Sequence, residues 1–413
     1  MLASTLYQLK RPWHLVKTGL LRGLVGQLKY RFPEKKLKII AITGTDGKTS
    51  SSTLLYHVLK QASVKVGLIS TVACYIGDDK IDTGLHVTSP DPKQLYELLQ
   101  KMVEAGVEYV VLEVTSHGAY QYRTWGLKPS IAAVTNITHE HLDYHLSMDE
   151  YIKAKAIILN KAQRVVLNLD DPNYGKLRRN LNKVGSQILT YGLSERVAPQ
   201  VAGAIKQRFK EQFNWLNGRL VYAVAREVGL VPAEIAEGVI SFPGIPGRME
   251  QVPTTKKFQV IVDFAHTPNG LKSALTALKK QVPKGGRLIA VYGSAGLRDH
   301  QKRPLMGKIG AELADLVVFT AEDPRTEDIW TIIRQMKQEL STNLDKVASV
   351  ADRGEAIQFA LKELAAPNDL VVILGKGHEQ SLCYGKTEYQ WSDVEVAKQV
   401  LAGKDLRELT PVP

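Results

Sequence analysis

Residues 43–50 have the types and the order of a phosphate-binding loop. The segment Thr-Gly-Thr-Asp-Gly-Lys-Thr-Ser follows the apolar run 37–42 and precedes a segment with helical spacing. Glycines in such a turn let backbone N–H groups converge on phosphate oxygens, and the following helix N-terminus adds its positive end. Lys48 would neutralise the β- and γ-phosphates, and the Thr49 hydroxyl would ligate Mg²⁺. Ile42 replaces the first glycine of the full motif, so a plain strand-to-helix turn is the alternative.

Two further segments carry side chains that bind metal ions. Glu113 ends an apolar run, where an unpaired carboxylate would be costly. At a strand's carboxyl end it could hold Mg²⁺ beside Thr49, or it could cap the following turn. Segment 138–145 holds three histidines and two acidic residues, without cysteine or the His-Glu-x-x-His spacing of zinc sites. One of these histidines could ligate a second Mg²⁺ or cap the next helix, and the spacing leaves both open.

Four polar loops in the second half of the chain each follow an apolar run. Ligands bind at the carboxyl edge of a parallel sheet, so loops at that edge predict a binding site. In one loop, Arg325 could grip a carboxylate with two guanidinium nitrogens. The four loops are 263–269, 293–299, 322–325 and 375–379.

The elements that would position these groups alternate between strands and helices from residue 37 onward. This alternation predicts an α/β fold with parallel sheets covered by helices. Predicted strands are 37–43, 109–114, 131–135, 164–168, 258–263, 287–292, 316–320 and 370–374, and predicted helices are 48–62, 92–105, 149–161, 233–241, 270–280 and 306–314.

A Pro- and Gly-rich segment, 242–247, is the strongest linker signal. We therefore expect an extension over 1–36, a P-loop ATPase-like central domain with a mostly parallel sheet over 37–245, and a Rossmann-like α/β domain over 246–413. On the helix predicted over 149–161, nothing local selects Lys155 over Lys153, because a helical lysine is usually a solvated surface residue.

Composition narrows the class of protein. The chain has 413 residues, 44% hydrophobic and 23% charged, which is typical of a globular protein of two or three domains. Two cysteines indicate neither a disulfide framework nor a zinc site, and no apolar run is long enough to cross a bilayer, so a cytoplasmic location is expected. The net charge of +12 suits an anionic substrate, and without arginine-rich or aromatic-basic runs no nucleic acid is expected.

Residues 13–32 carry leucines and a valine at helical spacing, with Lys and Arg between them. This pattern is compatible with an interfacial amphipathic helix that makes peripheral contact with a membrane. A helix packed on the body of the protein is the preferred alternative.

These motifs, in this order, resemble those of the Mur ligase family, and within it the UDP-N-acetylmuramoyl-tripeptide synthetase group. The resemblance runs from about residue 37 to residue 401. Besides the phosphate loop it includes 86–90 (His-Val-Thr-Ser-Pro), 113–117 (Glu-Val-Thr-Ser-His), 136–145, 246–250 (Pro-Gly-Arg-Met-Glu), 263–268, 298–306, 322–325 and 375–379.

The resemblance implies a role for each matching residue. Catalytic roles fall to Lys48, Glu113, His141 and Lys155, and metal ligation to Thr49, Glu113, His141 and Lys155, with two Mg²⁺ ions and Lys155 carbamylated. ATP contacts fall to Gly44, Thr45, Asp46, Gly47, Lys48, Thr49, Ser50, Asn136, Asp263 and His266. Substrate contacts fall to Thr88, Ser89, Thr115, Gln121 and Arg123 for the sugar-peptide, and to Arg298, Glu322, Asp323, Pro324, Arg325, Gly375 and Glu379 for the free amino acid.

The implied reaction is ATP-driven ligation of an amino acid, meso-diaminopimelate or lysine, to an anionic UDP-N-acetylmuramoyl-peptide through an acyl phosphate. Four departures from the family pattern qualify it. The family's N-terminal UDP-binding domain has no counterpart, and the β-rich segment before the Phe-Asn-x-x-Asn-like turn at 212–217 is reduced. Asp323 replaces the asparagine of the family's Asp-Asn-Pro-Arg motif, and Asp46 replaces an asparagine of the phosphate loop.

Two alternatives therefore stay open. The first is a Mur-type ligase acting on another carrier, lipid-linked or polyglutamate-like. The second is a non-catalytic ATP-binding subunit that regulates a partner protein.

Overall fold

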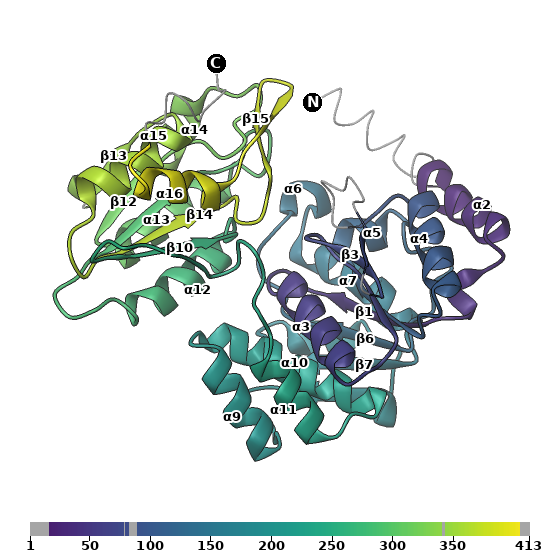
Figure 1. Ribbon diagram of the computed structural model, residues 1–413. Helices are drawn as coiled ribbons and strands as arrows, with labels where there is room; N and C mark the ends of the chain where they lie inside the picture. Colours follow the sequence, from purple (N-terminus) through teal and green to yellow (C-terminus); the bar gives the residue numbers. More distant parts are fainter. Residues whose placement is uncertain (1–15, 78, 82–88, 341–342, 405–413) are drawn as a thin grey trace. The chain divides into compact units, whose positions relative to one another are not determined.

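The computed structural model of the chain describes residues 16–77, 79–81, 89–340 and 343–404 (Figure 1). It divides into two compact units, the first within Met1–Thr138 and Tyr144–Pro243, the second within His139–Asp143 and Gly244–Pro413. Each unit is built on its own mainly parallel sheet, so the predicted α/β class is confirmed. Within the described ranges, no helix has both the length and the apolar character needed to cross a membrane.

The first unit contains an eight-stranded sheet in the order β4-β3-β2-β5-β1-β6-β7-β8. The six neighbouring strands β2, β5, β1, β6, β7 and β8 pair in parallel. At one edge of the sheet, β3 pairs antiparallel with β2, and β4 pairs antiparallel with β3. In β1, residues 39–42 are almost fully buried, as expected where helices cover both faces of a parallel sheet. The strands are β1 (Lys38–Thr43), β2 (Val66–Ile69), β3 (Cys74–Ile76), β4 (Asp79–Ile81), β5 (Tyr109–Glu113), β6 (Ile131–Val134), β7 (Arg164–Asn168) and β8 (Ile188–Tyr191).

Helices pack on both faces of this sheet. Helix α3 packs against α10 and α11 on one face, and α4, α5 and α7 lie on the other (Figure 1). The first described element is a π-helical segment, Val16–Leu21, that continues directly into α2. The helices are α2 (Arg22–Lys29), α3 (Lys48–Gln61), α4 (Pro92–Glu104), α5 (Ser116–Tyr120), α6 (Leu142–His145), α7 (Met148–Lys161), α8 (Tyr174–Arg179), α9 (Pro199–Arg208), α10 (Gln212–Val228) and α11 (Pro232–Ile240).

The second unit contains a six-stranded sheet in the order β13-β12-β11-β14-β10-β9, in which β9 alone is antiparallel, and a separate hairpin, β15-β16. One hydrophobic core lies between the sheet and α12–α14, and a second between the sheet and α15–α16. The elements are β9 (Glu250–Val252), β10 (Gln259–Asp263), α12 (Pro268–Lys279), β11 (Leu288–Tyr292), α13 (Lys302–Leu313), β12 (Leu316–Phe319), α14 (Ile329–Met336), β13 (Val347–Ser349), α15 (Arg353–Gln358), β14 (Leu370–Leu374), β15 (Ser381–Tyr384), β16 (Thr387–Gln390) and α16 (Asp393–Leu401).

One segment differs from the sequence-based expectation. The turn expected at 212–217 is the first part of the 17-residue helix α10. Its buried positions Leu220, Val221 and Val224 have helical spacing, and Gly229 ends the helix in a left-handed conformation. The apolar periodicity after residue 217 was the signal that the turn-like motif obscured.

Candidate active site

The phosphate loop connects β1 to α3, and its two glycines have conformations that other residues rarely adopt. Gly44 has φ +147° and Gly47 has φ +81°. A Cβ on Gly44 would lie 1.8 Å from Thr135 Oγ1, and one on Gly47 would lie 2.5 Å from Asn217 Oδ1. The loop therefore requires glycine at both positions, for its backbone angles and for the close approach of its neighbours.

Side chains from the next strand's loop hold the phosphate loop in place. Asn136 accepts a hydrogen bond from the Asp46 N–H (3.0 Å) and donates one to the Asp46 carbonyl (3.1 Å). Thr45 Oγ1 contacts Tyr151 OH (3.0 Å) and accepts from the Thr138 N–H (2.9 Å). Asn136 thus fixes the loop's backbone, and the N-terminus of α3 follows directly at Lys48.

Glu113 reaches this loop because of the register of the sheet. Ile42 of β1 pairs with Glu113 of β5, so the carboxyl ends of these neighbouring strands lie together. The Thr49 hydroxyl donates to the Glu113 carboxylate at 3.1 and 3.2 Å, and the Thr71 N–H and hydroxyl each donate at 3.0 Å. Glu113 is 1% exposed, and hydrogen bonds from three donor groups stabilise its buried carboxylate. The expected pair of first-metal ligands is therefore in direct contact.

Lys155 is distinguished from Lys153 by its burial. Lys153 lies on the exposed face of α7 and pairs with Glu150, whereas Lys155 is 1% exposed. The Lys155 ammonium donates to the Gly44 carbonyl (2.5 Å) and lies 4.4 Å from the centre of the Tyr151 ring. A lysine is rarely buried to this degree, and this one is buried against the phosphate loop.

The three histidines of 138–145 have three different environments. His145 is buried and its Nε2 lies 3.0 Å from Ser116 Oγ. His139 is exposed, and His141, with φ +56°, lies 3.7 Å from Glu140 through Nδ1. None of them caps α7, because the Ser147 hydroxyl does. His141 is grouped with the second unit, whereas Thr49, Glu113 and Lys155 belong to the first.

Four of the residues expected to hold the sugar-peptide form one connected cluster. Ser89 Oγ lies 3.1 Å from Thr115 Oγ1, and Arg123 donates to the Ser89 carbonyl (2.8 Å) and to Gln121 Oε1 (3.0 Å). Gln121 in turn donates to Tyr144 OH (3.0 Å), a residue the motifs did not single out. The fifth expected residue, Thr88, lies outside the described residues.

In the second unit, the loops after β12 and β14 meet around a buried lysine. Lys376 Nζ pairs with Asp323 (2.8 Å) and with Glu379 (2.5 Å), and it is 1% exposed. Burial acts to lower the pKa of Lys376, but the two carboxylates outweigh it and raise that pKa. Arg325 donates to the Gly296 carbonyl (2.8 Å) and lies 3.9 Å from Asp323. Three residues predicted to bind the amino acid, Asp323, Arg325 and Glu379, therefore lie around Lys376, which the motifs did not single out.

The loops after β11 and β12 contain residues with left-handed backbone conformations and a buried carboxyl group with a raised pKa. Leu297, Asp323 and Arg325 all have positive φ, between +44° and +56°. Such conformations cost about 1–3 kcal/mol each and concentrate at functional sites. Beside them, burial raises the pKa of Glu322 to about 8, and its Oε2 has no hydrogen-bond partner among the described residues. A Cβ on Gly375 would lie 2.5 Å from that oxygen. Pro324 lies between Asp323 and Arg325 in the same loop.

The remaining expected residues of the second unit belong to the loops after β10 and β11, and the Asp263 carbonyl accepts from the Gly375 N–H (3.1 Å) beside the lysine cluster. Asp263 ends β10 and accepts from the N–H groups of Met249 (2.8 Å) and Ala265 (2.9 Å), and burial raises its pKa. His266 lies against the Phe264 ring, with 4.4 Å between ring centres. Arg298 is exposed in the loop after β11. In the first unit, the expected ATP-binding residue Ser50 follows Thr49 in the first turn of α3.

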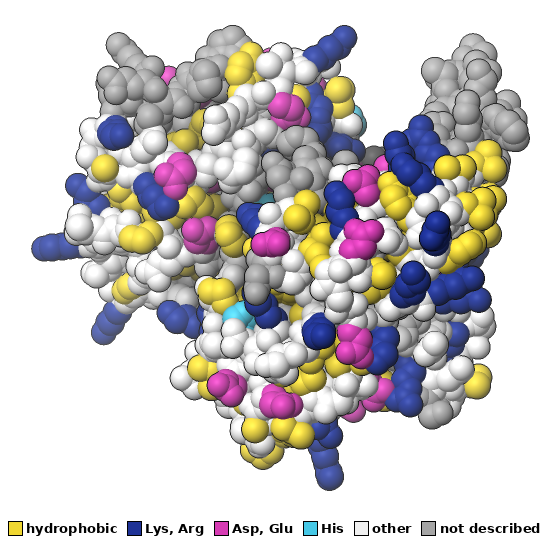
Figure 2. Space-filling view, turned by 45° about the vertical axis from the view of Figure 1, so that its right-hand side comes forward, with side chains coloured by type: hydrophobic (Ala, Val, Ile, Leu, Met, Phe, Trp, Pro, Cys, Tyr) yellow, Lys and Arg dark blue, Asp and Glu magenta, His cyan; other side chains and the backbone are white. Residues whose placement is uncertain are grey.

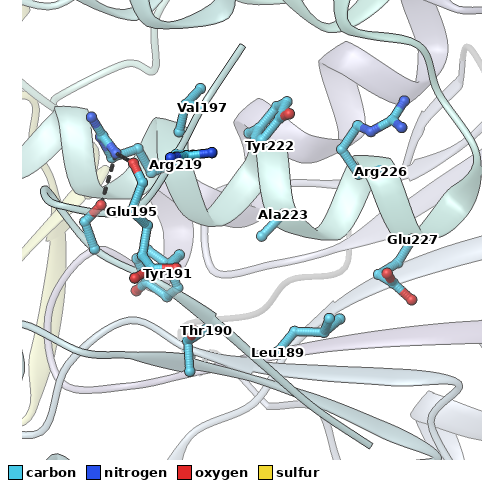
Figure 3. A pocket seen from close by; sticks show the side chains of 12 residues that line it. Leu189, Thr190, Tyr191, Glu195, Val197, Arg219, Tyr222, Ala223, Arg226 and Glu227 are labelled. Atoms are coloured by element: carbon cyan, nitrogen blue, oxygen red, sulfur yellow. Dashed lines mark hydrogen bonds between the residues drawn. The ribbon is translucent and has the colours of Figure 1, made fainter. Parts of the chain in front are cut away.

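A cavity of about 280 Å³ lies elsewhere, at the outer edge of β8 beside α10 (Figure 3). None of the expected site residues lines it. Arg219 donates to the carbonyls of Gly192 and Glu195, and Arg226 donates to the Leu230 carbonyl. These arginines serve the fold, so we do not assign the cavity to the chemistry.

The whole arrangement fits a nucleotide and Mg²⁺. In the described part of the chain, no three His, Cys, Asp or Glu side chains gather into a metal-binding cluster. The expected set instead combines a carboxylate, a hydroxyl, an imidazole and a lysine, and hydroxyl and carboxylate oxygens are the ligands that Mg²⁺ prefers. Buried Glu113 in contact with Thr49, at the start of a helix that follows a glycine loop, is such an oxygen pair.

Comparison with known proteins agrees with this geometry. Family models for the Mur ligase middle domain and for the Mur ligase glutamate ligase domain match residues 42–224 and 247–377. The UDP-N-acetylmuramoyl-L-alanyl-D-glutamate–2,6-diaminopimelate ligase 1 of Clostridium acetobutylicum is 34% identical over 400 residues, covering 92% of this chain and 81% of the relative. The chain belongs to the Mur ligase family. The resemblance drawn from the motifs is thereby confirmed.

Other Mur ligases show the same relationship. The diaminopimelate ligase of Caldanaerobacter subterraneus is 36% identical over 394 residues, covering 90% of this chain and 80% of the relative. A solved structure of such a ligase, at 30% identity, has a TM-score of 0.59 and covers 93% of this chain and 83% of that chain. A Mycobacterium tuberculosis folylpolyglutamate synthase, at 18% identity and a TM-score of 0.70, shares the fold.

Proposed function

We propose that this Mur ligase adds an amino acid to a UDP-N-acetylmuramoyl-peptide at the expense of ATP, in peptidoglycan precursor synthesis. The observation that carries the proposal is the contact of Thr49 with buried Glu113 beside a glycine-dependent phosphate loop. The relatives at 34–36% identity are named as ligases that join 2,6-diaminopimelate to UDP-N-acetylmuramoyl-L-alanyl-D-glutamate. We place the reaction in the cytoplasm, which suits the two buried, free cysteines.

The reaction has two steps. A carboxylate oxygen of the acceptor peptide attacks the γ-phosphorus of ATP, which releases ADP and leaves an acyl phosphate. The amino nitrogen of the free amino acid then attacks the acyl carbon, phosphate leaves, and the nitrogen loses a proton. Lys48 and the loop N–H groups stabilise the charge on the phosphate oxygens, and Asn136 keeps those N–H groups in position.

Thr49 and Glu113 would hold one Mg²⁺, which neutralises phosphate charge when bound. For Lys155 we propose carbamylation, in which the neutral amine adds to CO₂ and loses a proton. The product is an oxygen ligand in place of a buried cation. Its burial against the Gly44 carbonyl and the Tyr151 ring supports this, because an ammonium is costly to bury there. For His141, metal ligation rests on the family resemblance.

We assign the loops around Lys376 to the incoming amino acid. Arg325 would pair with a distal carboxylate, which favours meso-diaminopimelate over lysine. Asp323 is engaged by Lys376, so its negative charge is balanced inside the protein and does not by itself select a second ammonium group.

Phosphate release tests the proposal. With ATP, Mg²⁺ and UDP-N-acetylmuramoyl-dipeptide, we expect release only when meso-diaminopimelate is also present, and much less with lysine. Release without either substrate, or none with both, would refute the assignment. In the second case lipid-linked and polyglutamate acceptors would be tried next.

Carbamylation is tested separately with Lys155→Ala and the exposed control Lys153→Ala. We expect Lys155→Ala to lose activity and to regain part of it with added acetate, which can supply the missing oxygen ligand. Lys153→Ala should behave as the wild type. Full activity of Lys155→Ala at ordinary Mg²⁺ would exclude the role.

A further inference from the structure

The helix formed by Val16–Leu21 and α2 packs on the first unit with its glycines toward the unit and its large apolar side chains toward solvent. Residues Gly19, Gly23 and Gly26 face the body of the unit, where a Cβ on Gly19 would lie 2.0 Å from the Gln121 carbonyl oxygen. A Cβ on Gly26 would lie 2.7 Å from the Tyr96 ring. Only glycine fits along this face, so the larger side chains of the helix cannot turn toward the body.

The large apolar side chains consequently point outward. Leu21, Leu24, Val25 and Leu28 follow the spacing i, i+3, i+4, i+7 and are 45%, 42%, 60% and 60% exposed. We call these four residues the apolar stripe. Single exposed leucines are common on protein surfaces, but four on one helix face form a continuous patch of the kind that contacts a partner. Figure 2 shows hydrophobic side chains gathered over the region of α2 on its right-hand side.

The charges around the stripe indicate the chemistry of a surface that would complement it. Residues 19–36 contain five Lys and Arg residues, all exposed, and a single acidic residue, Glu34, which is buried and accepts a hydrogen bond from Gln27 (2.8 Å). Exposed cations lie on or just after the helix, and one of them, Arg22, pairs with Asp91 at 2.8 Å. A second copy of this chain would place cations against cations, whereas an anionic lipid surface complements both the charge and the apolar stripe. The exposed cations are Arg22, Lys29, Arg31, Lys35 and Lys36.

We propose that the apolar stripe and these cations dock the protein on an anionic membrane surface. An exposed apolar helix face flanked by basic residues can lie in the interface plane, with its apolar side chains among the lipid headgroups. Such binding combines apolar burial with attraction to anionic lipids. The proposal does not depend on the ligase assignment.

Docking would have a consequence for the proposed site. The helix packs directly on the loop that follows α5, through Gly19 at Gln121 and Gly23 at Trp125. Gln121 and Arg123 of this loop belong to the cluster proposed to hold the sugar-peptide. The membrane-bound enzyme would therefore hold its acceptor-binding loop beside the lipid surface.

Flotation of the full-length protein with vesicles tests the proposal. We expect binding to phosphatidylcholine vesicles that contain phosphatidylglycerol, weak binding to phosphatidylcholine alone, and loss of binding as salt is raised. The double variant Leu24→Ser with Leu28→Ser should bind at least about tenfold more weakly. A matched control is Val184→Ser with Val231→Ser, which removes two exposed apolar side chains (68% and 51% exposed) from other surfaces of the same unit.

The thermal unfolding midpoint and phosphate release with water-soluble substrates show whether the stripe variant is intact. Equal vesicle binding by the stripe variant and the wild type would overturn the proposal. Absence of binding to anionic vesicles would also overturn it. In that case a dimer that the stripe variant abolishes would identify a second copy as the occupant, and an unchanged monomer would indicate coverage by another segment of this chain.

Discussion

Replacing Glu113 by glutamine separates the fold from the proposed chemistry. In the wild type, the carboxylate accepts bonds from the Thr49 hydroxyl and from the N–H and hydroxyl of Thr71. The glutamine amide has the same shape. Its oxygen can keep both Thr71 bonds, and its NH₂ can donate to the Thr49 hydroxyl, which rotates to accept. We therefore expect the free energy of unfolding to change by no more than about 1 kcal/mol.

Activity should respond very differently. The amide carries no charge and presents N–H groups where a metal ligand is needed. Loss of one preorganised electrostatic group costs about 10²–10³ in turnover, or about 3–4 kcal/mol. We expect a loss of phosphate release of this size, partly relieved at high Mg²⁺.

The assay is phosphate release across a range of Mg²⁺ concentrations, together with chemical denaturation. Glu108→Gln is a matched control, since Glu108 makes an exposed ion pair with Lys38 at 2.7 Å. That change should leave both readouts nearly unaltered. If Glu113→Gln kept wild-type turnover at every Mg²⁺ concentration, the metal role of Glu113 would be refuted. A large loss of stability would instead refute the hydrogen-bond argument.

Three further results are expected. Gly47→Ala should abolish ATP binding measured by calorimetry, because Gly47 has a φ of +81° and its neighbours leave no room for a Cβ. The control Gly77→Ala, with a φ of +61° and open space around it, should lower the free energy of unfolding in denaturant by only the backbone cost of about 1–2 kcal/mol. Arg353→Ala should destabilise the protein by about 3–5 kcal/mol in the same measurement, because it strands the buried Asp393 carboxylate, and a change under about 1 kcal/mol would contradict this. Burial raises the pKa of Glu322 to about 8 in the folded protein, so the folded state holds the proton more tightly than the unfolded chain. The resulting contribution to the free energy of unfolding is fully present below the unfolded pKa of about 4.5, and it is lost as the pH rises through about 8. Denaturation from pH 5 to 8 should therefore show wild type losing stability relative to Glu322→Gln, and parallel curves would contradict the burial argument.

Much of the fold was predictable because parallel strands buried on both faces give continuous apolar runs. The strands at 164–168 and 370–374 were predicted with the bounds they have, and every other predicted strand and every predicted helix except 306–314 agrees with the observed bounds within two residues. The short strands β4 and β8 at the two sheet edges lack such runs and were missed, as was the short strand β2 inside the sheet. Helix α10 was missed because its first turn carries a motif that was interpreted as a turn.

The candidate site was only partly predictable. Spacing alone could indicate Lys48 and Thr49, because the phosphate loop is local in sequence. It could not select Lys155 over Lys153, since burial depends on how α7 packs against the loop at Gly44. Thr71, which donates twice to Glu113, has no sequence signal because the sheet register brings it there.

The central claim is that the acceptor carboxylate is activated on the γ-phosphate before the amide forms. The most direct measurement uses UDP-N-acetylmuramoyl-dipeptide labelled with ¹⁸O in its terminal carboxylate, and mass analysis of the released phosphate. The account predicts that one ¹⁸O atom moves into the phosphate for each amide formed, and only in the presence of the amino acid. Amide formation with unlabelled phosphate would contradict it.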